Sequence, residues 1–130
     1  MLDIVKYWLD LADDDVSAAK VLLDEKKYLH AGFFCHLIAE KALKATIAYV
    51  TSESPPKIHH LINLSEHAGV FDDLSESQRN LLNELNPLNI EARYPEYKER
   101  ITQVLTAEIT SRILHETEEF LCWIKQKLEK

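Results

Sequence analysis

Glycine and proline are rare in this chain, which has only two glycines and four prolines among 130 residues. Folds made of many short strands need frequent turns, and turns depend on these two residue types. Long stretches without either residue favour long helices instead. Hydrophobic residues make up 46% of the chain, which is enough for a core, and the length suits one domain. We therefore expect a single all-α domain over residues 1–130.

Hydrophobic residues recur at helical spacing in three long segments. Apolar positions three and four residues apart predict helices over residues 3–24 and from about residue 99 to the C-terminus. Residues 29–50 are apolar on almost all sides, which is typical of a central helix. Two short helices are predicted over residues 59–68, before Gly69, and from Ser75 to the residue before Pro87. These elements predict an up-and-down bundle of about five helices, three long and two short.

The net charge of the chain restricts which partners it can bind. The chain has 15 Lys and Arg against 22 Asp and Glu, a net charge of −7, so stand-alone binding of DNA is not expected. The acidic run 13–15 is expected to be a solvated face. Cys35 and Cys122 are expected to be buried, reduced thiols, as in a cytoplasmic protein. The N-terminal residues do not look like a signal peptide, and no apolar stretch is long enough to span a membrane.

The polar residues of the central helix are the first candidates for a site. His36, Glu40 and Lys44 follow one another at steps of four residues and so form one stripe, with Lys41 beside it. Charged groups on a mostly buried helix need partners or a ligand. A Glu40–Lys44 pair would give two of them a purely structural role. Such a pair does not account for His36 and Lys41, so a binding role remains open.

Two further polar clusters lie in the connection that follows this helix. His59 and His60 come just after the proline loop, where a helix N-terminus favours an anion, although His59 could simply cap that helix. Arg93 precedes Tyr94, and a guanidinium beside a ring suits a phosphate and a base. Alternatively, Tyr94 packs at the end of the bundle and Arg93 pairs with an acid.

We predict that these groups converge on one pocket for a nucleotide. The residues expected to bind it are His36, Lys41, Lys44, His59, Arg93 and Tyr94, with Glu40 and His60 in supporting roles. No metal site is expected, because the Glu-x-x-His pattern of di-metal helical bundles does not occur. The chain has no glycine-rich phosphate loop, which argues against an autonomous kinase or ATPase. No cofactor is expected.

Three short motifs in this order resemble the HEPN family, named for nucleotide-binding domains of higher eukaryotes and prokaryotes. They are Ala39-Glu40-Lys41-Ala42-Leu43-Lys44-Ala45 after Tyr28, then Lys57-Ile58-His59-His60-Leu61, and Arg93-Tyr94-Pro95. The resemblance implies a helical bundle, frequent dimerisation and association with nucleotidyltransferases. His60 stands where the family often has aspartate.

Some members of that family are RNases that use an arginine followed by a histidine four to six residues later. No arginine here has a histidine at that spacing, and Arg112 and His115 stand too close together. Weak or absent RNase activity is therefore expected, and the chain is not expected to be an enzyme.

Three functions remain as hypotheses. The first is a nucleotide- or phosphate-binding subunit that partners a minimal nucleotidyltransferase, as in a toxin–antitoxin pair. The second is an RNase toxin with an irregular site, in which His36 or His59 acts with Arg93. The third is a non-catalytic dimerisation module. A homodimer is expected in each case, because Trp8, Phe120 and Trp123 could add apolar surface to the outer helices.

Overall fold

The computed structural model describes residues 2–91 and 95–129, with side chains described outside residues 90–98. Its elements, in chain order, are α1 (Asp3–Asp24), α2 (Tyr28–Thr51), α3 (Leu61–His67), a 3₁₀ turn η1 (Phe71–Asp73), α4 (Glu76–Glu91), α5 (Pro95–Val104) and α6 (Ala107–Leu128). Helices hold 82% of the residues, and the described part of the chain contains no strand. The predicted all-α bundle is therefore confirmed.

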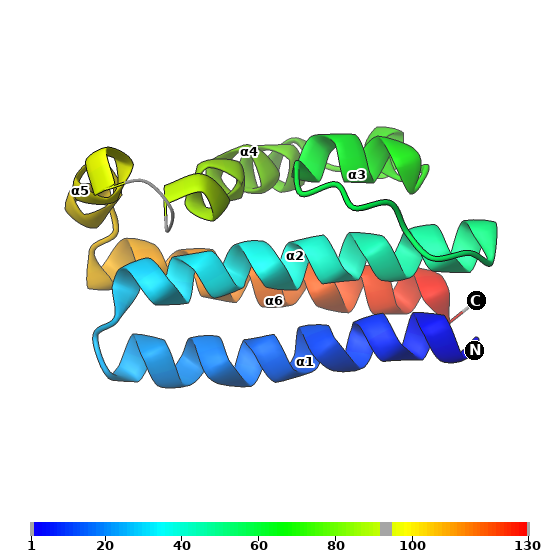
Figure 1. Cartoon of the computed structure of the whole chain (residues 1–130), viewed down its shortest axis with the longest axis horizontal. Coiled ribbons are helices and arrows are strands. Elements are labelled where there is room, and N and C mark those ends of the chain that lie inside the picture. Colours follow the sequence, from blue (N-terminus) through cyan, green and yellow to red (C-terminus); the bar gives the residue numbers. More distant parts are fainter. Residues whose placement is uncertain (1, 92–94, 130) are drawn as a thin grey trace.

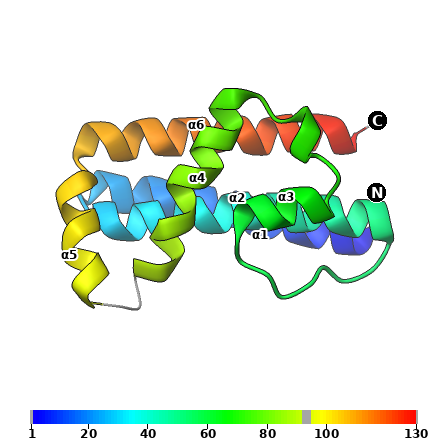
Figure 2. The same cartoon turned by 90° about the horizontal axis from the view of Figure 1, so that it is seen from above.

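Three long helices, α1, α2 and α6, run side by side along the long axis of the molecule (Figure 1). The connection from α2 to α6 forms a second layer, in which α3 and α4 lie over α2. Seen from above, α4 crosses α2 and reaches over to α6 (Figure 2). The start of α1 and the end of α6 lie at the same end of the bundle, and α5 lies at the other end (Figure 1).

Helix α2 is central, as its sequence indicates. It contacts α1, α3, α4, α5 and α6, and most of its residues from Ala31 to Ala48 are buried. An apolar helix surface of this kind is stable only when neighbours cover it on several sides. Gly32 lets Leu88 and Leu105 pack directly against α2, because a Cβ at this position would stand 3.0 Å from Leu105 Cδ1 and 3.2 Å from Leu88 Cδ1.

Two predicted helix boundaries are wrong. Helix α4 does not stop before Pro87 but continues to Glu91 with this proline inside it. Proline cannot donate the helical hydrogen bond to the carbonyl of Asn83. Leu85 and Leu88, on either side of it, are 0% and 3% exposed. Their burial against the rest of the bundle holds the helix through the proline.

The predicted C-terminal helix is in fact two helices. Helix α5 ends at Val104, and the hydroxyl of Thr106 accepts a hydrogen bond of 3.2 Å from the Ile109 N–H, which starts α6. Leu105, between them, is 3% exposed. The apolar stripe therefore continues across the gap between two helices. The described part of the bundle has six α-helices, where about five were expected.

Three expectations about individual side chains need correction. Asp15 is not part of a solvated face, because it is buried beside α2. Phe120 is 2% exposed and belongs to the core, whereas Trp8 and Trp123 are only partly buried. Both cysteines are free, but only Cys35 is buried, and burial raises the pKa of its thiol to about 12. None of the helices described here has the length and apolar character to cross a membrane.

Candidate functional site

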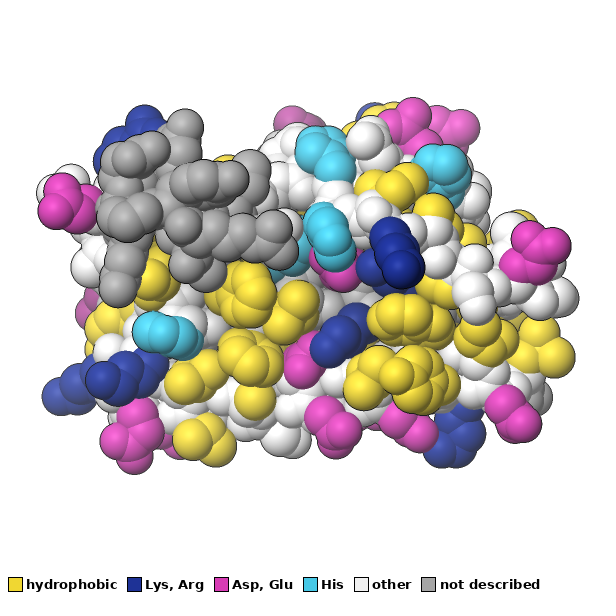
Figure 3. All heavy atoms as spheres, viewed as in Figure 1, with side chains coloured by type: hydrophobic (Ala, Val, Ile, Leu, Met, Phe, Trp, Pro, Cys, Tyr) yellow, Lys and Arg dark blue, Asp and Glu magenta, His cyan; other side chains and the backbone are white. Residues whose placement is uncertain are grey.

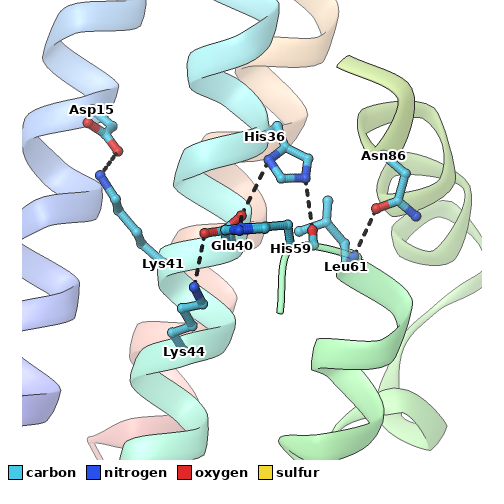
Figure 4. Close-up of polar contacts among 8 residues, drawn as sticks. All are labelled: Asp15, His36, Glu40, Lys41, Lys44, His59, Leu61 and Asn86. Atoms are coloured by element: carbon cyan, nitrogen blue, oxygen red, sulfur yellow. Dashed lines mark hydrogen bonds and ion pairs between the residues drawn. The ribbon is translucent and has the colours of Figure 1, made fainter. Parts of the chain in front are cut away.

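A buried glutamate on α2 forms the centre of the candidate site. Successive steps of four residues bring His36, Glu40 and Lys44 onto one stripe of that helix. Glu40 Oε2 lies 3.1 Å from Lys44 Nζ, and Glu40 Oε1 accepts a hydrogen bond of 3.1 Å from Nδ1 of His59 (Figure 4). One carboxylate thus joins α2 to the loop that precedes α3.

Lys44 is occupied by protein groups. Its side chain is 8% exposed, and its ammonium lies 5.5 Å from the centre of the Trp8 ring on α1 in addition to the contact with Glu40. A buried cation needs compensation of this kind. Lys44 therefore holds α2 to α1, and its charge is neutralised inside the protein.

His36 is buried completely and carries one unsatisfied nitrogen. Its Nε2 donates to the backbone carbonyl of His59 over 3.0 Å, so in the neutral ring Nδ1 has a lone pair and no proton. Nδ1 faces Glu40 Oε1 at 3.7 Å, and it has no hydrogen-bond partner among the described residues. Burial lowers the pKa of His36 to about 4, although the nearby Glu40 opposes the shift. His36 is therefore neutral at neutral pH.

His59 is the exposed member of the cluster, with 52% of its side chain accessible. Because Nδ1 donates to Glu40, the other ring nitrogen, Nε2, is left as an acceptor on the solvent side. A carboxylate that holds one nitrogen of an imidazole fixes both its tautomer and its orientation. The neutral ring is therefore oriented so that Nε2 can accept a hydrogen bond from a ligand.

A hollow of about 540 Å³ adjoins His59. The described residues that line it are His59, His60, Asn83, Asn86, Pro87 and Asn89. Histidine side chains gather on the same face of the molecule, next to the apolar surface of α1 and α2 (Figure 3). The hollow therefore brings together the loop before α3 and one face of α4.

The wall of the hollow is braced by contacts between these two segments. Asn86 Oδ1 accepts a hydrogen bond of 2.8 Å from the Leu61 N–H at the start of α3 (Figure 4). His60, not His59, caps α3, and its Nδ1 lies 3.3 Å from the Asn63 N–H. Its Nε2 lies 3.3 Å from Asn86 Nδ2. A neutral imidazole has only one acceptor nitrogen, so it satisfies one of these two donors at a time.

A model of the HEPN domain family matches residues 5–128. The chain belongs to the HEPN domain family. No match was found among curated proteins or among solved structures. Membership makes this a helical domain of the nucleotide-binding type, and HEPN domains often dimerise.

Four residues predicted for the site of this HEPN domain do come together: His36, Glu40, Lys44 and His59. Lys41 does not join them. It lies one residue further round α2, faces α1, and forms a 2.5 Å ion pair with Asp15 (Figure 4).

Two more predicted residues cannot be placed, because Arg93 and Tyr94 lie outside the described residues. Of the residues predicted to line the pocket, His59 and His60 lie at the hollow, whereas the two lysines of α2 are paired with acids.

The asparagines of α4 were missed by the sequence analysis. Asn83, Asn86 and Asn89 recur every three residues, a spacing that keeps them on neighbouring faces of a helix. That pattern was visible in the sequence. A helix that ended before Pro87 would leave Asn89 in a loop, so the predicted boundary hid the spacing of the three asparagines.

Proposed function

We propose that this HEPN domain is the nucleotide-binding subunit of a two-component system, in which it partners a minimal nucleotidyltransferase as in a toxin–antitoxin pair in the cytoplasm. The observation that carries the proposal is the placement of His59. Its Nδ1 is held by the buried Glu40, and its other face is exposed at a hollow. A volume of about 540 Å³ lies within the usual range for small-molecule sites.

The roles of the predicted residues follow from their contacts. His59 and His60 line the hollow and would touch the nucleotide. Glu40 orients His59, while Lys44 compensates the charge of Glu40. Arg93 and Tyr94 keep their predicted roles in binding phosphate and base, since they follow α4 directly in sequence.

Calorimetric titration with AMP and ATP tests binding. We expect heat of binding with the wild type and its loss in His59→Ala, which removes the imidazole at the hollow. His115→Ala is the matched control, because His115 is an exposed histidine on α6 outside the hollow. The proposal is wrong if neither nucleotide gives heat at millimolar concentration, or if His59→Ala binds as well as the wild type.

The partner is tested separately by inspecting the genes beside this one for a small nucleotidyltransferase and co-expressing that protein with this chain. We expect the two chains to purify as one complex when only one of them carries an affinity tag. The absence of an adjacent nucleotidyltransferase gene, or the purification of the tagged chain alone, would remove the partner from the proposal and leave nucleotide binding intact.

RNA cleavage is the second candidate, and the same histidine is the observation in its favour. A carboxylate that orients an imidazole is the arrangement used for a general base. In this chain Glu40 and His59 have that geometry, with a distance of 3.1 Å between Oε1 and Nδ1. We still expect weak or no cleavage, because the family's arginine–histidine spacing is absent. Cleavage of RNA by the purified wild type, lost in His59→Ala, would make this the better function.

A further inference from the structure

The described part of the hollow's wall exposes more apolar than polar surface and carries no charged side chain. Its described lining residues are histidines, asparagines and a proline, without a lysine, arginine, aspartate or glutamate. The lysines of α2 do not supply a free charge, since Lys44 is paired with Glu40 and Lys41 with Asp15. Tight binding of a phosphate depends on cations or on several converging N–H donors. The described wall therefore suits a largely apolar ring with polar edges better than a phosphate.

Two asparagine amides at the hollow have no hydrogen-bond partner among the described residues. Asn86 is committed, because its Oδ1 accepts the Leu61 N–H at 2.8 Å. The side chains of Asn83 and Asn89 make no hydrogen bond within the described residues, and Asn83 is exposed. A side-chain amide presents a donor and an acceptor next to each other, which is the pattern that pairs with the amino group and ring nitrogen of adenine.

Pro87 adds a further acceptor at the same place. Proline has no N–H, so the backbone carbonyl of Asn83 lacks the hydrogen bond that residue 87 would donate in a regular helix. Both residues line the hollow. A backbone carbonyl without its helical donor benefits from a ligand that donates one. The exocyclic amino group of a base is such a donor.

From these contacts we infer that the hollow binds the adenine base of the nucleotide, with the amides of Asn83 and Asn89 on its edge and the imidazole of His59 against its face. The inference rests on the proposed function and makes it more specific. The base, not the phosphate, supplies most of the recognition by the described wall. A flat imidazole offers a stacking surface that is independent of charge.

Titrations with four ligands test the inference on the wild-type protein: AMP, adenosine, inosine and ribose 5-phosphate. We expect adenosine to bind within about threefold of AMP, and ribose 5-phosphate not to bind. Inosine should bind about tenfold more weakly than adenosine, because it replaces the amino group with an oxygen and leaves the acceptors at the hollow unpaired.

Two variants locate the base. Asn83→Ala and Asn89→Ala should each weaken adenosine and AMP by the same factor, about fivefold or more. Asn80→Ala is the matched control, since Asn80 is an exposed asparagine of α4 outside the hollow, and it should bind as the wild type does. Circular dichroism of each variant confirms that the helices are retained.

The outcomes separate this inference from the proposed function. If AMP and ribose 5-phosphate bind alike and adenosine does not bind, the hollow holds the phosphate and the inference is wrong while nucleotide binding stands. The same holds if both asparagine variants bind adenosine like the wild type. If AMP itself does not bind, the proposed function and the inference fail together.

Discussion

Removing Glu40 should destabilise the bundle strongly, because the buried ammonium of Lys44 would lose the carboxylate that compensates its charge. The two side chains are 6% and 8% exposed, and their charged atoms lie 3.1 Å apart. Breaking a buried ion pair from one side costs about 3–5 kcal/mol. We therefore expect Glu40→Leu to lower the free energy of unfolding by about 3 kcal/mol or more, a large share of the 5–15 kcal/mol typical of a domain.

Replacing both partners should cost much less than the two single changes together. Lys44→Met alone leaves the Glu40 carboxylate buried, with a cost of about 3 kcal/mol. In Glu40→Leu with Lys44→Met neither charge remains, and the main loss is the hydrogen bond from His59, about 1 kcal/mol. Additive behaviour would give a loss of about 6 kcal/mol, so the coupling is large enough to measure.

Urea unfolding followed by far-UV circular dichroism, at one fixed protein concentration, measures these differences. A loss of 3 kcal/mol lowers the midpoint by about 1–3 M urea at usual slopes. The Lys6–Asp10 pair on α1 has the same residue spacing but is 67% and 59% exposed, so Asp10→Asn should leave the urea midpoint almost unchanged. A double variant that loses as much as the sum of the singles would refute the reasoning.

Three further predictions use other features of the fold. The pKa of His36 is lowered to about 4, so between about pH 6.5 and pH 4 the unfolded chain takes up a proton that the native state does not. As the pH falls through this window, the free energy of unfolding should decrease by up to about 3 kcal/mol, as measured by unfolding at a series of pH values. His36→Gln should remove this pH dependence, and His115→Asn should leave it unchanged. Thr106→Ala removes the cap of α6 and should lower the free energy of unfolding by about 1 kcal/mol. Ser77→Ala removes an exposed hydroxyl inside α4 and should lower it by less than half as much, so equal losses in urea titrations would argue against a capping role. Light scattering should give twice the 15.1 kDa of one chain, because exposed apolar side chains such as Tyr7 remain beside the partly buried Trp8, and a mass of 15.1 kDa at micromolar concentration would exclude the dimer.

The helix content was predictable because the apolar periodicity is strong, whereas the helix ends were not. The helix is interrupted at Thr106, but the apolar spacing continues from Ile101 through Leu105 to Ile109. A prediction from periodicity alone therefore merges α5 and α6 into one helix. Pro87 marks a stop by local rules, yet buried neighbours keep it inside α4. In both cases the decisive term is tertiary packing or a single cap, which a pattern of apolar residues does not encode.

The candidate site shows the same division. The stripe of His36, Glu40 and Lys44 follows from helical geometry and was predictable. Lys41 pairs with Asp15 instead of joining the stripe, and this pairing depends on where α1 packs against α2. One signal was present in the sequence, since Asp15 lies in phase with Ala12 and Ala19, which are both fully buried on the same face of α1. This signal was hard to recognise because Asp15 is the last of three consecutive aspartates, which together suggest a solvated face.

The shared end of α1 and α6 has a consequence for how the chain can be rearranged. Because α1 begins and α6 finishes beside each other, a short flexible linker could join the two ends, and new ends could be opened elsewhere. The turn between α1 and α2, at the opposite end of the bundle, is exposed and contains Lys26 in a left-handed conformation with φ 62°. A circular permutant opened there would keep every helix of the wall around His59 intact, so it offers a way to attach a reporter far from the hollow.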